Sequence, residues 1–239
     1  MNAFGGDVFH QNTAPSLSAA DFFNSAALLL GRETPRVLHE VIPHLEEYAG
    51  RWHPAGFMVF ALGDTGDGSS LRLHIWPRGL RRPHSAGKTV HDHPWHIASK
   101  TLTEAPNRDV LYTIEPRGIL SSAERVARGL HRIFRATYAP GQPDRLTTDG
   151  ACAKVVPFAT RIMNSTTLNR IPAGVYHLDD ISEDTTVATL CLDSPTVIEG
   201  PHILINTTAS EIEVNRPAVT LEEALRAKAL VLGSLALAA

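Results

Sequence analysis

The chain has 239 residues, of which 43% are hydrophobic and 20% are charged, a balance that excludes a wholly disordered protein. A formal net charge of −3 and a pI near 6.4 argue against a nucleic-acid partner, because such partners require a basic surface. No apolar run reaches the roughly 18 residues that a membrane span needs, and the N-terminus lacks the pattern of a secretory signal. Because the chain has only two cysteines, Cys152 and Cys191, we expect a cytoplasmic protein in which both are buried, inert thiols.

Helical patterns dominate the first 54 residues. Ser16 or Ser18 can cap a helix that runs through an Ala-, Phe- and Leu-rich stretch to Leu30. A second pattern places apolar residues at 38, 41, 42 and 45, and Pro43 is positioned to kink it. Residues 1–54 are therefore predicted to be a leader followed by a helical extension.

From residue 56 onward the sequence consists of short β-branched and aromatic runs, separated by Gly, Pro, Asp and Asn. The runs cover residues 56–63, 71–77, 109–116, 131–140, 154–164, 186–193 and 202–208. Many short strands bounded by turns favour a sandwich or barrel over alternating βαβ units. We predict a mainly β barrel over residues 55–216, with a helical insertion near 118–131, and a C-terminal helix over 217–239.

The segment at residues 90–96, Val-His-Asp-His-Pro-Trp-His, carries most of the chemical information. On a strand, His91 and His93 point to the same face, where two imidazoles can share one divalent metal. The Pro-x-Gly-x-x-His run at residues 172–177 makes a tight turn that would deliver His177 from a neighbouring strand. Imidazole ligands suit Fe(II), Zn, Ni or Cu. The sequence therefore predicts a metal site formed by His91, His93 and His177.

Other residues are candidates to assist this site. His96 falls on the opposite face under strict alternation, but a bulge at Pro94 would turn it inward as a ligand or as a neighbour of the ligands. Tyr176 adjoins the third histidine and is a second candidate to tune the site. Glu104 is the nearest acid downstream of the motif and a further possible ligand.

Arginines on the predicted strands are candidates to hold a substrate anion, because a guanidinium can bind a carboxylate through two parallel hydrogen bonds. The candidates among apolar neighbours are Arg72, Arg135 and Arg161. Arg72 is the first choice, since it lies on the strand before the His-x-His motif. His74 lies two residues further along the same predicted strand, on the same face as Arg72. We expect it to be a core histidine with its hydrogen bonds made, unless that face lines the barrel. The five arginines between residues 117 and 135 are expected to form a solvated helix face.

The pattern His-x-His followed by Pro-x-Gly-x-x-His resembles the two metal motifs of the cupin superfamily, a double-stranded β-helix barrel. The match covers about residues 55–205, and Ile97 and Ala98 stand where cupins usually carry a glutamate ligand. The three histidines that remain resemble the iron site of thiol dioxygenases, the cysteine dioxygenase and plant cysteine oxidase group. The run His-Asp-His-Pro, followed by Ser99-Lys100-x-Leu102, is similar to the first sequence motif of that group. Two features differ: 83 residues separate His93 from His177, where cupin metal motifs are usually a few dozen residues apart, and the second motif lacks the Ser-x-His-x-Tyr pattern of animal cysteine dioxygenases.

The resemblance implies a metal-dependent enzyme, a non-haem Fe(II) dioxygenase that combines O2 with a small anionic or thiol-containing substrate. Arg72 would hold the substrate anion, and Tyr176 or His96 would tune the metal site. The alternative is a Zn, Ni or Mn isomerase, lyase or cyclase in which the metal is a Lewis acid. A non-catalytic small-molecule-binding cupin and a structural cupin are further alternatives. The resemblance also implies a homodimer.

Overall fold

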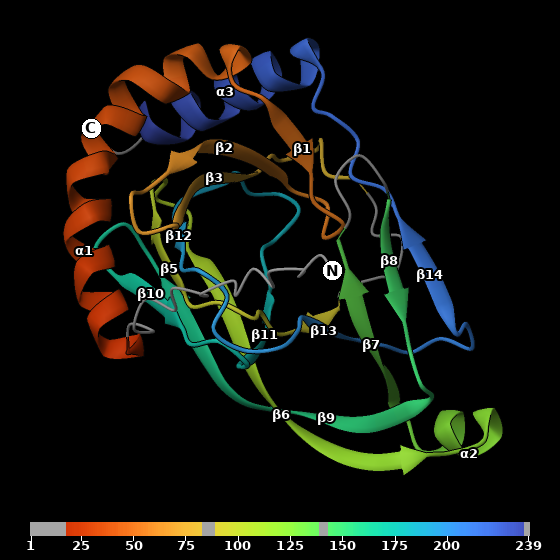
Figure 1. Cartoon of the computed structure of the whole chain (residues 1–239). Helices are drawn as coiled ribbons and strands as arrows, with labels where there is room; N and C mark the ends of the chain where they lie inside the picture. The colour runs from red at the N-terminus through yellow and green to blue at the C-terminus, as the bar shows by residue number, and fades with distance from the viewer. Residues whose placement is uncertain (1–17, 83–88, 139–142, 237–239) are drawn as a thin grey trace, which may run out of the picture.

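The computed structural model describes residues 18–82, 89–138 and 143–236, in which two antiparallel sheets are flanked by helices (Figure 1). Sheet A contains β1 (Gly50–Trp52), β2 (Met58–Asp64), β3 (Ser70–Trp76), β12 (Val187–Asp193), β5 (Ile97–Thr101) and β10 (Leu168–Ile171), in that order. Sheet B contains β13 (His202–Ile205), β4 (Val90–His91), β11 (Tyr176–Asp179), β6 (Asn107–Ile119), β9 (Ala151–Met163), β7 (His131–Thr137), β8 (Asp144–Thr147) and β14 (Glu211–Val214).

Eight of these strands have the connectivity of a jelly roll. The order β3-β12-β5-β10 in sheet A faces the order β4-β11-β6-β9 in sheet B, so the chain passes repeatedly from one sheet to the other. Two Greek keys combined in this way form the double-sheet barrel of cupins. The mainly β, cupin-type fold with helices at both ends of the chain, predicted from the sequence, is confirmed.

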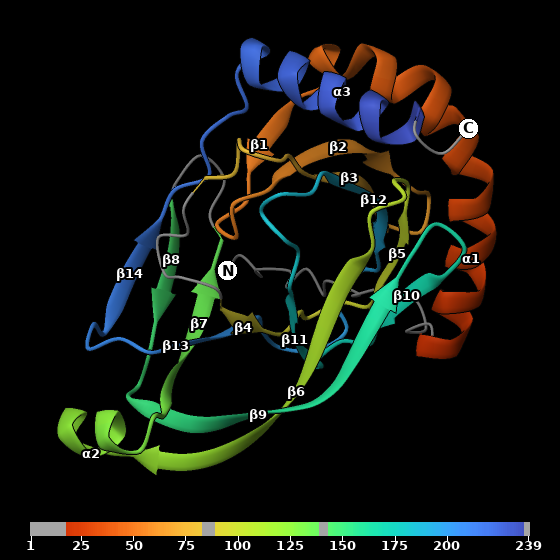
Figure 2. The ribbon, with the colours of Figure 1, turned by 180° about the vertical axis from the view of Figure 1, so that it is seen from behind.

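The helices cover the outer face of sheet A (Figures 1 and 2). They are α1 (Ala19–Arg36), a π-helical turn (Val37–Val41), a 3-10 segment (Ile42–Glu47) and α3 (Leu221–Ala236). Ser18 caps α1 by accepting from the Asp21 backbone N–H, as the sequence predicted, but the helix continues six residues beyond Leu30. No helix in the described part of the chain is long and apolar enough to cross a membrane.

The largest hydrophobic core lies between sheet A and these helices, outside the barrel. Alternate residues of β3, namely Leu71, Leu73 and Ile75, are buried in it together with Phe22 and Leu30 of α1. The intervening residues of β3 point the other way, into the barrel, because side chains on a strand alternate between faces. The stability of sheet A therefore comes mainly from its outer face.

Sheet B also closes into a small ring of its own, since β13 pairs with both β4 and β7. The ring runs β13-β4-β11-β6-β9-β7, and each of the six strands contributes an apolar side chain to one cluster. The cluster contains Val90, Tyr112, Ile114, Ile133, Ala153, Val155, Tyr176, Leu178 and Leu204. Sequence analysis did not predict this closure.

The short helix α2 (Ser122–Ala127) lies between β6 and β7, within the range where a helix was predicted. Ser121 and Glu124 form a capping box at its start. The prediction of a fully solvated arginine face is wrong for Arg125, which is 1% exposed and donates to the Asn206 side-chain oxygen. This hydrogen bond connects α2 to the segment that follows β13.

Candidate metal centre

A cavity of about 1050 Å³ lies between the two sheets. Its lining includes all three predicted ligands: His91 and His177 on strands of sheet B, and His93 just after β4. The opposite wall is the inner face of sheet A, with Arg72 and His74 of β3. The jelly roll thus brings two segments that are 83 residues apart in sequence to one side of this cavity.

The three histidines form a compact cluster. One ring nitrogen from each lies within 4.8 Å of the others, and the Nε2 atoms of His93 and His177 are 3.1 Å apart. Two nitrogens bound at right angles to one ion, each at about 2.1 Å, are separated by about 3.0 Å. The spacing of these two imidazoles therefore fits neighbouring positions on a single metal ion.

Hydrogen bonds fix the tautomers of two of these rings. His91 Nδ1 lies 3.1 Å from the Thr89 carbonyl oxygen, and His177 Nδ1 lies 3.0 Å from Asp109 Oδ1. Because a carbonyl oxygen and a carboxylate can only accept, both Nδ1 atoms donate, which makes Nε2 the nitrogen through which each neutral ring would bind a metal ion. A carboxylate behind a ligating histidine orients the ring and raises its basicity. Sequence analysis missed Asp109, because its pairing with His177 depends on the register of β6 and β11.

Electrostatics favour a cation on this side of the cavity. Burial alone would lower the pKa of His177, but the hydrogen bond and charge of Asp109, with Asp179 and Asp92 nearby, raise it. Burial, followed by the neighbouring His91 and His177, holds the pKa of His93 well below its usual range, so its imidazole is neutral. Imidazoles beside buried carboxylates are a donor set suited to a divalent transition metal, whose binding displaces any proton from Nε2.

The turn before β11 positions His177. The Val175 N–H donates to the Pro172 carbonyl, and Gly174 takes a φ of +76°, a left-handed conformation that favours glycine. A Cβ on Gly174 would also meet the Ile198 side chain at 3.0 Å. The Gly174 N–H donates to the His93 carbonyl oxygen, so the turn links the two motifs directly.

The first motif forms less strand than predicted, because β4 ends at His91. Asp92 is 3% exposed and accepts hydrogen bonds from the backbone and the ring of His202 on β13. This anchor holds Asp92 away from the cavity, and His93 still reaches the cluster. The ring centroids of His91 and His93 are 4.8 Å apart.

Three of the other candidates lie outside the cluster. His96 Nδ1 accepts from the Ala173 backbone N–H, and its ring packs against Phe22 and Phe23 of α1, so it supports the turn but does not face the metal site. Tyr176 points into the apolar cluster of the small ring, where burial and the nearby Asp92 raise its pKa to about 12. Glu104 is exposed in the loop after β5. His96 thus lies away from the histidine pair, as strict alternation predicted, and the alternative of an inward turn at Pro94 does not occur.

Of the three arginines predicted to hold a substrate anion, one lines the cavity and two do not. Arg72 lines the cavity, but its Nη1 lies 3.0 Å from Asp193 Oδ2, so its charge is already compensated. Arg135 is exposed and paired with Glu199, and Arg161 is exposed and donates to the Arg170 carbonyl, so neither points into the barrel. Sequence analysis missed Asp193, which β12 places beside Arg72.

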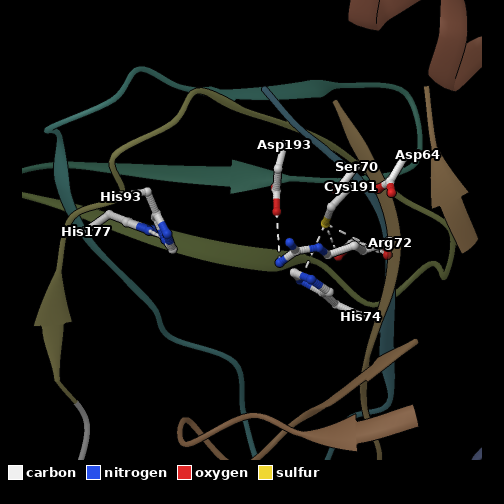
Figure 3. Close-up of polar contacts among 9 residues, drawn as sticks. Asp64, Ser70, Arg72, His74, His93, His177, Cys191 and Asp193 are labelled. Carbon is white, nitrogen blue, oxygen red and sulfur yellow. Dashed lines mark hydrogen bonds and ion pairs between the residues drawn. The ribbon is translucent and has the colours of Figure 1, made fainter. Parts of the chain in front are cut away.

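His74 lines the cavity and is not the satisfied core residue that we expected. Its Nε2 is buried without a hydrogen-bond partner among the described residues, and its Nδ1 is 3.5 Å from the Cys191 sulfur. Burial, with a contribution from Arg72, lowers the pKa of His74 to about 3. Burial raises the pKa of the Cys191 thiol, which therefore stays protonated, as expected of an inert thiol. Figure 3 shows Arg72, His74, Cys191 and Asp193 grouped together, apart from His93 and His177.

No protein-family model matches the sequence, and none of the curated proteins matches it. Among solved structures, the DMSP lyases RdDddP and RnDddQII are 14% identical over 61% of this chain and 51% of that one, with a TM-score of 0.30. This chain thus spans about half of the matched lyase chain. A cupin-like protein from Thermotoga maritima is 14% identical over 75% of this chain and 93% of that one, with a TM-score of 0.27.

A third similar structure, Streptomyces PAC13 with uridine, is 9% identical over 74% of this chain and 92% of that one, with a TM-score of 0.20. TM-scores this low carry no argument. The fold therefore rests on the strand order, and the candidate site rests on its own geometry: together they define a cupin-type barrel with three histidines placed to bind a metal.

Proposed function

We propose that this chain is a metal-dependent cupin enzyme in which His91, His93 and His177 hold one transition-metal ion. The observation that carries the proposal is the convergence of three imidazole nitrogens within 4.8 Å, with Nδ1 of His91 and of His177 each held by a hydrogen bond outside the cluster. We further propose a non-haem Fe(II) dioxygenase that acts on a small anionic or thiol-containing substrate. The proposed partners are this substrate and O2, and a homodimer stays a prediction.

When bound, Fe(II) would supply reactivity toward O2, whereas Zn(II), Ni(II) or Mn(II) would supply Lewis-acid polarisation. The protein's own contribution begins with the ligands, which are all neutral. Because no carboxylate belongs to the three-histidine set, the charge of the ion is left to attract an anionic atom of the substrate. Asp109 positions His177 for this role.

Apolar side chains line part of the rest of the cavity. Phe57, Trp76 and Ile97 line it, and Phe57 stacks on Trp76 with ring centroids 4.4 Å apart. A volume of about 1050 Å³ accommodates a small molecule. These apolar side chains lower the local dielectric, which strengthens every polar contact that the substrate makes.

Oxygen consumption tests the oxygenase proposal. The anaerobically purified protein is loaded separately with Fe(II) and Zn(II), and O2 uptake is recorded with a panel of small thiols and carboxylic acids. We expect uptake with iron alone, and its loss in His93→Ala. Tyr176→Phe, whose side chain lies on the other face of β11, is the matched control and should keep the uptake.

Two outcomes would contradict the dioxygenase proposal and favour one of the alternatives. Tight zinc binding without substrate-dependent O2 uptake in either metal form would contradict the dioxygenase and favour an isomerase, lyase or cyclase. A protein that binds small molecules from the panel without any turnover would favour a non-catalytic binding role.

A further inference from the structure

A row of polar residues crosses the inner face of sheet A. In the strand register, Cys191 pairs with Arg72 on one side and with Ser99 on the other, and Ser99 pairs with Asn169. All four residues line the cavity, and Asp193 follows on the same face of β12. The row lies across the cavity from the histidine cluster of sheet B. A substrate held by a metal ion at the histidines would present its far end to this row.

The charges in the row cancel. Arg72 Nη1 and Asp193 Oδ2 are 3.0 Å apart, and the Asp193 side chain is only 6% exposed. A carboxylate placed beside this pair would be attracted by Arg72 and repelled by Asp193 at nearly the same distance, and an ammonium group would meet the reverse. Since the pair offers little net attraction, a charged group would not regain the solvation that it loses on entering the cavity.

Some polar atoms in the same region make no hydrogen bond to the described residues. Three polar atoms on this wall are buried without a hydrogen-bond partner among the described residues: Asp193 Oδ1, Asn169 Oδ1 and His74 Nε2. Nearly all buried polar atoms in native proteins are hydrogen-bonded, so these atoms point to a polar molecule in the cavity. The oxygens of Asp193 and Asn169 require a donor, which a carboxylate lacks.

We infer that the Arg72–Asp193 pair recognises a neutral hydroxyl or carboxamide group at the end of the substrate remote from the metal. Such a group donates to Asp193 Oδ1 and accepts from Arg72 without adding a net charge. This inference rests on the proposed metal site and adds the substrate class. It replaces the role of Arg72 as a clamp for a carboxylate, because the structure pairs that guanidinium with Asp193.

Four thiols of the form HS–CH2–CH2–X test the inference, with X a hydroxyl, carboxamide, carboxylate or ammonium group. The protein is loaded with Co(II), and the thiolate-to-cobalt absorption band reports binding of each probe without any need for turnover. We expect both neutral probes to bind about tenfold more tightly than either charged probe. The carboxylate probe binding most tightly, or four equal affinities, would overturn the inference.

Charge variants sharpen the test. Asp193→Asn leaves Arg72 uncompensated and should shift the preference to the carboxylate probe, whereas Arg72→Gln should shift it to the ammonium probe. The double variant removes both charges and should return to the neutral probes, which keeps the test decisive if a single variant fails to fold. Arg135→Gln, which breaks an exposed pair with Glu199, is the matched control and should keep the parent ranking.

Metal content measured before the titrations separates the two possible failures. Parent protein that takes up no cobalt would contradict the metal site and this inference together. Parent protein that binds cobalt and thiols but ranks a charged probe first would contradict the inference alone.

Discussion

The two faces of sheet A differ in what they do. On β3, Leu71, Leu73 and Ile75 pack against the helices, whereas Arg72 and His74 face the cavity. The outer face buries apolar surface, which is the main favourable contribution to folding. The inner face carries the Arg72–Asp193 ion pair and unpartnered polar atoms, which cost stability. The barrel can hold a polar interior because its stability is supplied from outside.

The largest effect on folding is expected on the outer face. Leu190 is fully buried against the helices, and its neighbours Thr189 and Cys191 line the cavity. Leu190→Ala should lower the free energy of unfolding by about 2–5 kcal/mol, because it leaves a void in the core. Denaturant unfolding measures this loss. Metal stoichiometry of the folded variant should stay unchanged, and its loss would show that the two faces are not independent.

On the side of the metal centre, Asp109→Asn should weaken metal binding and spare the fold. The carboxylate of Asp109 accepts from His177 Nδ1, and removing such a partner typically costs about 10–100-fold in metal affinity. Chelator competition measures the affinity, with exposed Asp184→Asn as the control. Unchanged affinity in Asp109→Asn would mean that His177 does not depend on this carboxylate.

A smaller, pH-dependent effect on stability is expected at Glu223 of α3, one of the helices that cover sheet A. Burial alone would raise the pKa of Glu223, but hydrogen bonds from the Thr220 N–H, Arg82 and Trp52 lower it to about 2. Because the folded pKa lies below the ordinary value of 4.5, the carboxylate stabilises the fold above that value. The stabilisation is lost as the pH falls from 4.5 toward 2.

Glu223→Gln should therefore cost about 1 kcal/mol at pH 7, the usual size of a helix-capping contribution. Unfolding of both proteins is measured from pH 7 down to pH 3, and the difference between them should shrink on the acid side. A difference that does not change with pH would contradict the ionic contribution of Glu223.

The smallest effect is expected from Tyr176→Phe, although sequence analysis made this residue a candidate for tuning the site. Its side chain lies in the apolar cluster on the opposite face of β11 from His177. Metal affinity in chelator competition should be unchanged. A loss as large as that of Asp109→Asn would contradict the placement of Tyr176 outside the site.

The sequence predicted the parts of this molecule that depend on local pattern. Period-two alternation placed Arg72 and His74 on one face, and the two short motifs identified all three clustered histidines. Asp109 and Asp193 could not be predicted, because each meets its partner only through strand register across 68 and 121 residues of sequence. Alternation also placed His96 on the opposite face from the histidine pair, where its ring packs against Phe22 and Phe23. The β13–β7 pairing that closes the small ring also has no local signal.

Elemental analysis of the anaerobically purified protein tests the central claim most directly. The account predicts close to one transition-metal ion per chain in the parent, and its loss in both His91→Ala and His177→Ala, while Arg135→Gln retains it. Because the two histidines come from different motifs, loss in both variants would show that the motifs share one site. A folded parent without bound metal, or full metal content in either histidine variant, would contradict the account.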